Sequence, residues 1–281
     1  MNYTDMNDER TKFTCEDLKD PKNGHIRKTG ELYRGKAKIV YSTNDPDIVI
    51  QHFTDNATAF NGEKKGIIKN KGIYNNQISS ILFSHLNQKN IPNHFISQLD
   101  SYEMLVNKVD IYPIEVVVRN VVAGSLSKRL GIPEGQKLSK PIIEYYYKND
   151  KLGDPMISED HIISLGLINK IPEDEKYLPV YNCEVQLILL KLKSMTKNIN
   201  EYLKEYFEKK QILLIDAKFE FGFEFNRKMI VLADELSPDT MRLWDKNTNE
   251  KLDKDRFRRD LGKVEESYME VVDRITCERS V

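Results

Sequence analysis

Three ionisable residues alternate along one stretch of the chain, and their spacing is suited to chemistry. Asp216, Lys218 and Glu220 lie two positions apart, with apolar or small residues between them. Alternate side chains of an extended strand share one face, so the acid, base and acid would lie together while the other face packs into a core. Two carboxylates beside a lysine can hold a divalent cation against a phosphate. The alternative is a structural ion-pair network without a ligand.

A second carboxylate group follows the same stretch. Asn226–Lys228 is a predicted turn, and Met229–Ala233 is a predicted strand that ends in Asp234. If the turn is centred near Arg227, the numbers of paired residues sum to about 454. This register would place Glu220 opposite Asp234, and it predicts a metal–nucleotide site.

Cations alternate in a similar way near the start of the chain. The segment 31–42, ELYRGKAKIVYS, is predicted as one strand with Arg34, Lys36 and Lys38 on one face. A turn at 44–47 and a partner strand at 48–53 would complete a hairpin. Three cations at this spacing suit a triphosphate, and they equally suit an exposed sheet edge that is protected by charge.

A third informative segment combines a buried strand with a helix start. Ile114–Val122 is mostly β-branched, as in a strand covered on both faces, yet it carries Glu115 and Arg119 on one face. Ser125 is predicted as the N-cap of a short helix that ends at Leu130, where exposed N–H groups would form an anion site. The alternative is that Ser125 only caps the helix and Arg119 pairs with Glu115.

Two amphipathic helices are predicted in the second half of the chain. Apolar residues recur every three or four positions over Tyr181–Lys210. A final helix is predicted from Asp253, with three arginines near its start. Cations there oppose the helix dipole, so we expect them to face a bound anion.

The whole chain has the composition of a soluble globular protein. It has 281 residues and a net charge of −1, which gives no general basic field for nucleic acid or membrane. Its three cysteines, Cys15, Cys183 and Cys277, have no zinc-ligand spacing, as expected for free thiols in a reducing compartment. Because no apolar run is long enough to span a membrane and the N-terminus does not resemble a signal peptide, we expect a cytoplasmic protein.

Several of these segments together resemble the SAICAR synthase family of de novo purine synthesis. The resemblance covers the chain from about Glu31 to Ile275. The matching strings are YRGKAK (33–38), TAFNGEKKG (58–66), PIEVVVRNVVAGSLSKRLG (113–131), DPMISEDH (154–161), IDAKFEFG (215–222), DELSPDTMRLWD (234–245) and DKDRFRRDLG (253–262).

The resemblance implies an α+β fold in two parts. A small antiparallel β domain at 31–109 would bind ATP, and a larger α/β domain at 110–281, with a central sheet and flanking helices, would bind the ribonucleotide. Residues 1–30 would be an N-terminal extension, poorly ordered or forming a short cap. Bacterial members of the family also suggest a homodimer.

The implied reaction is ATP-dependent amide formation. ATP, L-aspartate and carboxyaminoimidazole ribonucleotide would give SAICAR, ADP and phosphate through an acyl phosphate. The resemblance assigns residues to four roles: ATP binding to Lys36, Lys38 and Arg34; Mg²⁺ binding to Glu220 and Asp234; catalysis to Lys218, Glu220 and Asp234; and ribonucleotide binding to Arg119, Ser125, Arg242 and Arg258. The loop 58–66 is the candidate for aspartate.

Two other classes of protein remain possible from the sequence. A small-molecule kinase would release ADP without aspartate. A non-catalytic nucleotide-binding module would lack the metal ligands, but Glu220, Asp234 and Lys218 are all present. A nucleic-acid-binding protein is disfavoured because the chain has no extended basic stripe.

Overall fold

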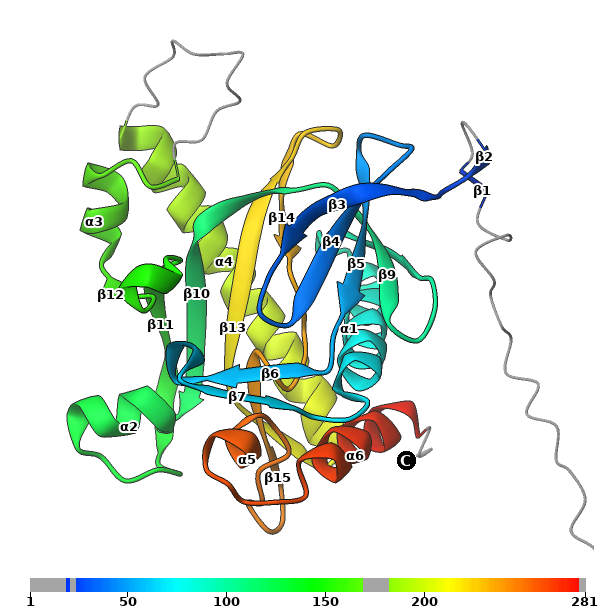
Figure 1. Ribbon diagram of the computed structural model, residues 1–281. Helices are drawn as coiled ribbons and strands as arrows, with labels where there is room; N and C mark the ends of the chain where they lie inside the picture. The colour runs from blue at the N-terminus through cyan, green and yellow to red at the C-terminus, as the bar shows by residue number, and fades with distance from the viewer. Residues whose placement is uncertain (1–18, 21–23, 169–181, 278–281) are drawn as a thin grey trace, which may run out of the picture.

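A computed structural model describes residues 19–20, 24–168 and 182–277 (Figure 1). Most of the predicted extension over 1–30 lies outside these residues. A short hairpin, β1 (Lys19–Asp20) and β2 (Gly24–His25), precedes the main sheets, and Ile26 is buried against the first of them. No helix in the described ranges is long and apolar enough to cross a membrane.

The first sheet has five antiparallel strands in the order β3-β4-β5-β9-β8. Its strands are β3 (Lys28–Arg34), β4 (Lys38–Thr43), β5 (Ile48–Phe53), β8 (Phe95–Gln98) and β9 (Glu103–Asn107). The hairpin predicted around 44–47 is confirmed as β4 and β5. The single strand predicted over 31–42 is wrong. A turn at 35–37 divides it, and the Gly35 N–H donates to the Lys38 carbonyl. Lys36 therefore lies in a turn, and Lys38 begins the next strand.

The second sheet is the larger one and contains both long strands of the protein. Its path is β12-β11-β10-β13-β14, and β15 also pairs with β13. The strands are β10 (Asp110–Val121), β11 (Lys137–Tyr147), β12 (Met156–Ile157), β13 (Ile212–Glu224), β14 (Met229–Ala233) and β15 (Met241–Asp245). The chain passes from the first sheet to the second between Asn107 and Asp110. A small hairpin of β6 (Asn56–Ala59) and β7 (Lys64–Ile67) forms a separate sheet beside them, with the one-turn helix η1 (Phe60–Gly62) at its tip.

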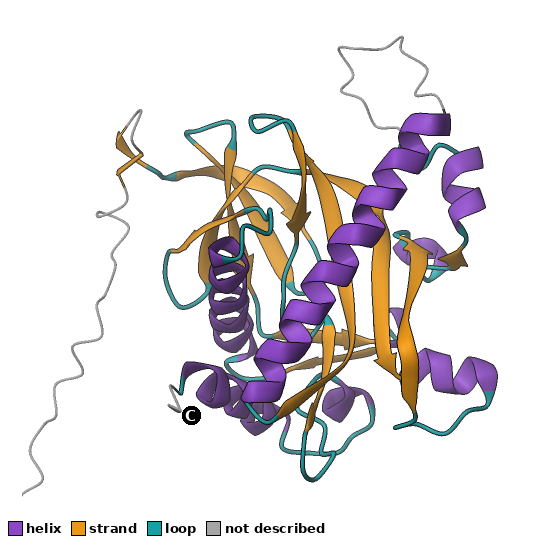
Figure 2. Cartoon of the chain, turned by 180° about the vertical axis from the view of Figure 1, so that it is seen from behind, coloured by secondary structure: helices purple, strands orange, loops and turns teal. Residues whose placement is uncertain are grey.

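Helices cover the sheets and close the core. They are α1 (Lys71–Gln88), α2 (Gly124–Leu130), η2 (Asp150–Leu152), α3 (Glu159–Ser164), α4 (Asn182–Lys209), α5 (Asp255–Arg258) and α6 (Val264–Thr276). The long helix α4 crosses one face of the large sheet (Figure 2), where its apolar stripe joins the main core. Helix α1 also contributes to this core, through residues such as Leu82 and Phe83. The predicted α+β class is confirmed.

The final helix differs from the prediction. Instead of one helix from Asp253, the structure has α5 and α6 with a break between them. Gly262 and Lys263 have φ angles of 67° and 48°, and these left-handed conformations interrupt a right-handed helix. The break separates the three arginines of 256–259 from the amphipathic part of the segment.

Gly222 allows a close approach between the two long strands. It pairs with Ile111 beside a shift in register between β10 and β13. A Cβ atom at this position would lie 2.5 Å from Cγ1 of Val109 and would also collide with the carbonyl group of Asp110. The β10–β13 pairing therefore depends on glycine at this point.

We predict that Gly222→Ala lowers the free energy of unfolding by at least about 2 kcal/mol, because overpacking against backbone atoms cannot be relieved by a rotamer change. Gly30→Ala in β3 is the matched control, since its Cβ would meet only Ser42 Oγ at 3.5 Å. Its unfolding free energy should stay within about 0.5 kcal/mol of wild type. Equal effects of the two substitutions in urea unfolding would contradict the prediction.

Candidate functional site

Two adjoining cavities lie beside the large sheet. The first has a volume of about 350 Å³ and the second about 480 Å³. The residues that line both, and so form a shared wall, are Lys36, Glu115, Asp154, Lys218, Asp239, Thr240 and Lys254. These residues come from both halves of the chain, so the site forms only when distant segments pack together.

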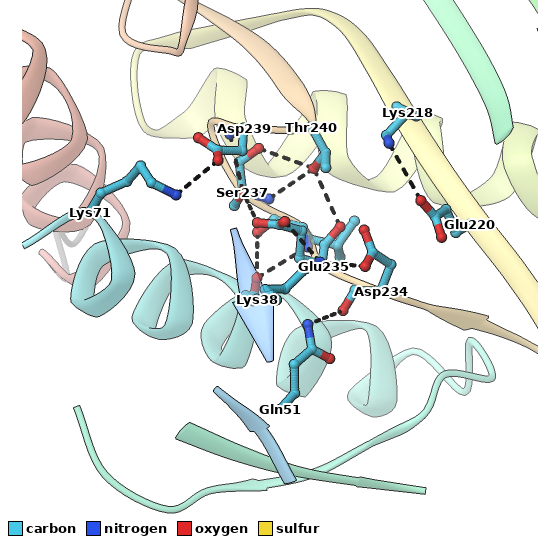
Figure 3. Close-up of polar contacts among 12 residues, drawn as sticks. Lys38, Gln51, Lys71, Lys218, Glu220, Asp234, Glu235, Ser237, Asp239 and Thr240 are labelled. Atoms are coloured by element: carbon cyan, nitrogen blue, oxygen red, sulfur yellow. Dashed lines mark hydrogen bonds and ion pairs between the residues drawn. The ribbon is translucent and has the colours of Figure 1, made fainter. Parts of the chain in front are cut away.

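The second cavity holds the carboxylates that the sequence singles out. Lys38 pairs with Asp234, and its Nζ is 2.9 Å from Glu235 Oε1 (Figure 3). Glu220 pairs with Lys148 and lies 3.4 Å from Lys218 Nζ. Glu220, Asp234, Lys38 and Lys218, which were predicted as site residues, therefore all line one cavity.

The predicted hairpin register is wrong by one residue. Glu220 pairs with Ala233, so paired residue numbers sum to 453, and β14 ends before Asp234. Asp234 instead adopts a left-handed backbone conformation with φ of 64°. The turn at 225–228 is centred between Asn226 and Arg227, half a residue before the assumed centre, and the sequence alone does not fix a centre to that precision.

Lys218 stands between carboxylates in the shared wall. Its Nζ is 2.5 Å from Glu115 Oε1, and Glu115 pairs with Glu220 across β10 and β13. Burial alone would lower the pKa of Lys218, but Glu220 and Glu115 raise it above its ordinary value. Burial raises the pKa of Glu115, and Lys218 opposes that shift. The lysine therefore stays protonated between the two acids.

The same balance acts at Asp234. Burial would raise its pKa, but Lys38 and the other nearby lysines lower it below the usual range. Burial would lower the pKa of Lys38, while Asp234 and Glu235 raise it. Both groups are therefore charged at neutral pH.

The carboxylates fit magnesium by their chemistry. Mg²⁺ prefers hard oxygen ligands and is commonly held by one or two carboxylates together with substrate phosphates. Glu220 and Asp234 supply such oxygens, and Glu235 adds a third nearby. Among the described residues, no group of three or more His, Cys, Asp or Glu side chains is arranged to hold a metal ion alone. The remaining ligands would have to come from a phosphate or water.

The first cavity is lined by a buried arginine network. Arg119, only 3% exposed, lies 2.8 Å from Glu144 and 3.1 Å from Asp216, and it also donates to Ser125 Oγ and Tyr146. It does not pair with Glu115, so the alternative pairing considered for Arg119 is wrong.

Ser125 is not the N-cap of α2. The N-cap is Ala123, and Gly124 begins the helix. The hydroxyl of Ser125 accepts a hydrogen bond from Arg119 in place of a capping bond. The predicted end of the helix at Leu130 is confirmed, and Gly131 follows it with φ of 66°.

Two further arginines complete this cavity. Arg242 lies 2.8 Å from Asp216 and 3.0 Å from Asp255, and Arg258 lies 2.6 Å from Asp255. Both line the first cavity, as do Arg119 and Ser125. The four predicted ribonucleotide residues are therefore brought together around one space.

Three other cations singled out in the sequence lie in different surroundings. Lys36 lines both cavities and pairs with Asp150 at 2.8 Å. Arg34 is exposed, pairs with Glu31, and does not line either cavity. Of the other arginines at the predicted helix start, Arg256 donates to the backbone of Gly262 and Lys251.

Several residues around the two cavities were not predicted from the sequence. Asp239 is buried and bonded to three groups, Lys71 at 3.0 Å, Lys254 at 3.3 Å and Tyr268 at 2.6 Å. These partners come from separate helices and a loop, so no local spacing connects them. Lys148, which follows β11 and pairs with Glu220 in the second cavity, was not predicted as a site residue either.

An arginine-lined cavity beside a cluster of lysine-paired carboxylates is the arrangement expected of an enzyme that acts on two anionic ligands side by side. Residues 31–275 match the family model of SAICAR synthetase. The chain therefore belongs to the SAICAR synthetase family.

Individual relatives agree with this assignment. A phosphoribosylaminoimidazole-succinocarboxamide synthase of Caldanaerobacter subterraneus subsp. tengcongensis is 52% identical over 87% of this chain and 96% of its own. The crystal structure of the synthase from Ehrlichia chaffeensis is 47% identical, with a TM-score of 0.79 over 89% of this chain and all of the other. A SAICAR synthetase in complex with ADP is 46% identical, with a TM-score of 0.78 over 89% of this chain and 99% of its own.

The family fixes the class of reaction. The protein is an ATP-dependent carbon–nitrogen ligase of purine biosynthesis. This result decides against a small-molecule kinase and against a non-catalytic nucleotide-binding module.

Glu134 links the start of α2 to the residue that follows α5. It accepts a hydrogen bond from the Gly124 N–H at 2.8 Å and pairs with Arg259 at 2.6 Å. The hydrogen bond from Arg259 lowers the pKa of Glu134 from 4.5 to about 2. A depressed carboxyl pKa stabilises the fold above pH 4.5, and this contribution is lost as the pH falls towards 2.

We therefore predict that Glu134→Gln lowers the free energy of unfolding by about 1 kcal/mol at pH 7. The difference from wild type should shrink steadily below pH 4.5, as measured by urea unfolding across pH. Glu201→Gln, at an exposed pair with Lys204, is the control and should change stability by less than about 0.5 kcal/mol at any pH. If the difference in unfolding free energy between Glu134→Gln and wild type grew as the pH fell, the pKa of Glu134 would not be lowered in the folded protein, and the prediction would be wrong.

Proposed function

We propose that the two cavities hold the two phosphorylated substrates of the ligation, ATP in the second cavity and carboxyaminoimidazole ribonucleotide in the first. The observation that carries this proposal is the shared wall, because two reacting groups must meet within bonding distance. Lys218 occupies that wall between Glu115 and Glu220.

The second cavity suits a nucleoside triphosphate. Lys36 and Lys38 supply cations for the phosphates, and Glu220 and Asp234 would hold Mg²⁺ beside them. The bound cation would neutralise charge on the transferring phosphoryl group. Tyr33, Ala37 and Tyr112 give part of the same cavity an apolar wall that suits a nucleoside. Arg34 lies outside this lining and is a weaker ATP contact than the two lysines.

The first cavity suits a phosphorylated ribonucleotide. Arg119, Arg242 and Arg258 supply guanidinium groups, which bind phosphate and carboxylate in a bidentate manner. Ser125 adds a hydroxyl beside Arg119. The substrate carboxylate would then point towards Lys218 in the shared wall.

The chemistry that fits this arrangement has two steps. A carboxylate is a poor electrophile, so its oxygen first takes the γ-phosphoryl group of ATP, and ADP leaves. The aspartate amine then attacks the acyl phosphate, loses a proton and expels phosphate. Lys218 would neutralise charge on the phosphoryl group in both steps, which is electrostatic stabilisation rather than proton transfer.

The β6–β7 hairpin is the proposed contact for aspartate. Thr58, Phe60 and Gly62 line the first cavity from the β6–β7 hairpin, which supports the 58–66 segment as the aspartate contact.

We also propose the division of the chain into an ATP-binding domain at 31–109 and a ribonucleotide-binding domain at 110–281. A cytoplasmic homodimer completes the proposal by analogy with bacterial members of the family.

The decisive test is ADP release by the purified protein with Mg-ATP and carboxyaminoimidazole ribonucleotide, with and without L-aspartate. Release should require both co-substrates. Lys218→Ala and Glu220→Ala should lower kcat by about 100-fold or more, because each removes a charge that acts on the transferring group. Lys204→Ala, an exposed lysine on α4, is the control and should keep full activity. ADP release that is indifferent to aspartate would contradict the proposed ligation.

A second test concerns Arg242 alone. A Cβ atom on Gly124 would lie 2.6 Å from Cζ of Arg242, whereas one on Gly131 would meet nothing within 4 Å. Both glycines have positive φ, so alanine strains the backbone at either position. Gly124→Ala should raise KM for the ribonucleotide about tenfold, because it displaces the guanidinium. Gly131→Ala should lose similar stability and keep the wild-type KM. Equal KM values for the ribonucleotide in both variants would contradict the assignment of Arg242 to the ribonucleotide site.

A further inference from the structure

The turn that carries Asp234 and Glu235 has an unusual geometry for the end of a strand. Consecutive side chains of a strand point to opposite faces, yet Asp234 and Glu235 both contact the same Nζ atom of Lys38. The left-handed conformation of Asp234, with φ of 64°, turns the chain so that both carboxylates face one cation. A non-glycine residue in this conformation costs roughly 1–2 kcal/mol, so the surroundings must hold it in place.

The large sheet does not hold this turn. The β13–β14 ladder ends with the pair Glu220 and Ala233, one residue before Asp234. Side chains bond the backbone groups beyond that pair. Thr240, close in sequence, donates to the Glu235 carbonyl at 3.3 Å, and the others come from the first sheet and α1. Gln51 Nε2 in β5 donates to the Asp234 carbonyl at 3.3 Å. Ser79 Oγ in α1 accepts from the Leu236 N–H and donates to the Leu236 carbonyl, both at 3.1 Å.

Both side chains are buried and come from the first hundred residues of the chain. Gln51 is 4% exposed and Ser79 is 0% exposed. Figure 3 shows Gln51 reaching the Asp234 backbone from the side opposite Lys218 and Glu220. Buried backbone groups that lose a partner are costly, so these bonds give the turn a single position.

We propose that Gln51 and Ser79 are positioning residues for the metal–phosphate site. They hold the Asp234–Leu236 turn so that the two carboxylates and Lys38 meet at one place. Neither residue lines either cavity, and each acts through the backbone of the turn. The inference rests on the proposed function, because it assumes that phosphates and Mg²⁺ bind beside Lys38 and Asp234.

Ser79→Ala tests the proposal, with Ser80→Ala as a matched control. Ser80 is the next residue of α1, is 5% exposed, and its Oγ has no hydrogen-bond partner among the described residues. The measurement is the affinity for ADP by calorimetry, once with Mg²⁺ and once with a chelator. Ser79→Ala should reduce the gain in affinity that Mg²⁺ provides by about tenfold and leave the metal-free affinity unchanged. Ser80→Ala should keep the full gain.

The outcomes separate the inference from the proposed function. If wild-type protein binds ADP equally well with and without Mg²⁺, the proposed metal site fails. If wild type gains affinity and folded Ser79→Ala keeps all of that gain, the inference alone is overturned. If Ser79→Ala lowers thermal stability but keeps the full increase in ADP affinity that Mg²⁺ provides, Ser79 has only a structural role, and the inference is again overturned. If Ser79→Ala does not fold, Gln51→Met, which keeps the length and removes the donor, gives the same test.

Discussion

The site depends on mutual neutralisation of charges that the fold has removed from water. Glu115 and Glu220 oppose each other on β10 and β13, where like charges repel. Lys218 lies between them, and Lys148 neutralises the far side of Glu220. A buried carboxylate without a partner costs several kcal/mol, so this arrangement is stable only while the lysines stay protonated. The raised pKa of Lys218 shows that the acids ensure this.

Such internal pairs also bear on how ligands bind. A phosphate that enters the second cavity competes with Glu220 and Asp234 for the lysines, and a divalent cation competes with the lysines for those carboxylates. Either ligand alone leaves some buried charges unpaired, whereas both together give every charge a new partner. We therefore expect nucleotide and cation to bind more tightly together than the separate affinities imply, which is positive coupling between two ligands of one site.

Local patterns in the sequence predicted much of this architecture, and long-range packing accounts for the rest. Alternation identified β13 and placed Lys218 and Glu220 on one face, because a strand has a period of two whatever it packs against. The register of β14 was wrong by one residue, since turn geometry cannot be read from composition alone. Asp239 and Lys71 are 168 positions apart, and only the packed structure brings them within 3.0 Å. The roles expected for residues such as Arg242 and Arg258 came from the family resemblance, because residue spacing alone does not indicate which ligand a residue binds.

The contacts across the cavities also connect site formation to folding. Lys38 begins β4 of the first sheet, and its partner Asp234 follows β14 of the second, 196 positions later. Ser79 and Gln51 make bonds over similar separations. Asp234 and Glu235 therefore lack their Lys38 countercharge until the first sheet has packed against the second, whereas Glu115 and Glu220 find lysines within the large sheet. Since unpaired charges oppose burial, closing the two sheets together and completing the Lys38, Asp234 and Glu235 cluster are expected to occur together. Because Lys38 and Asp234 both line the second cavity, their pairing also brings the two sides of that cavity together.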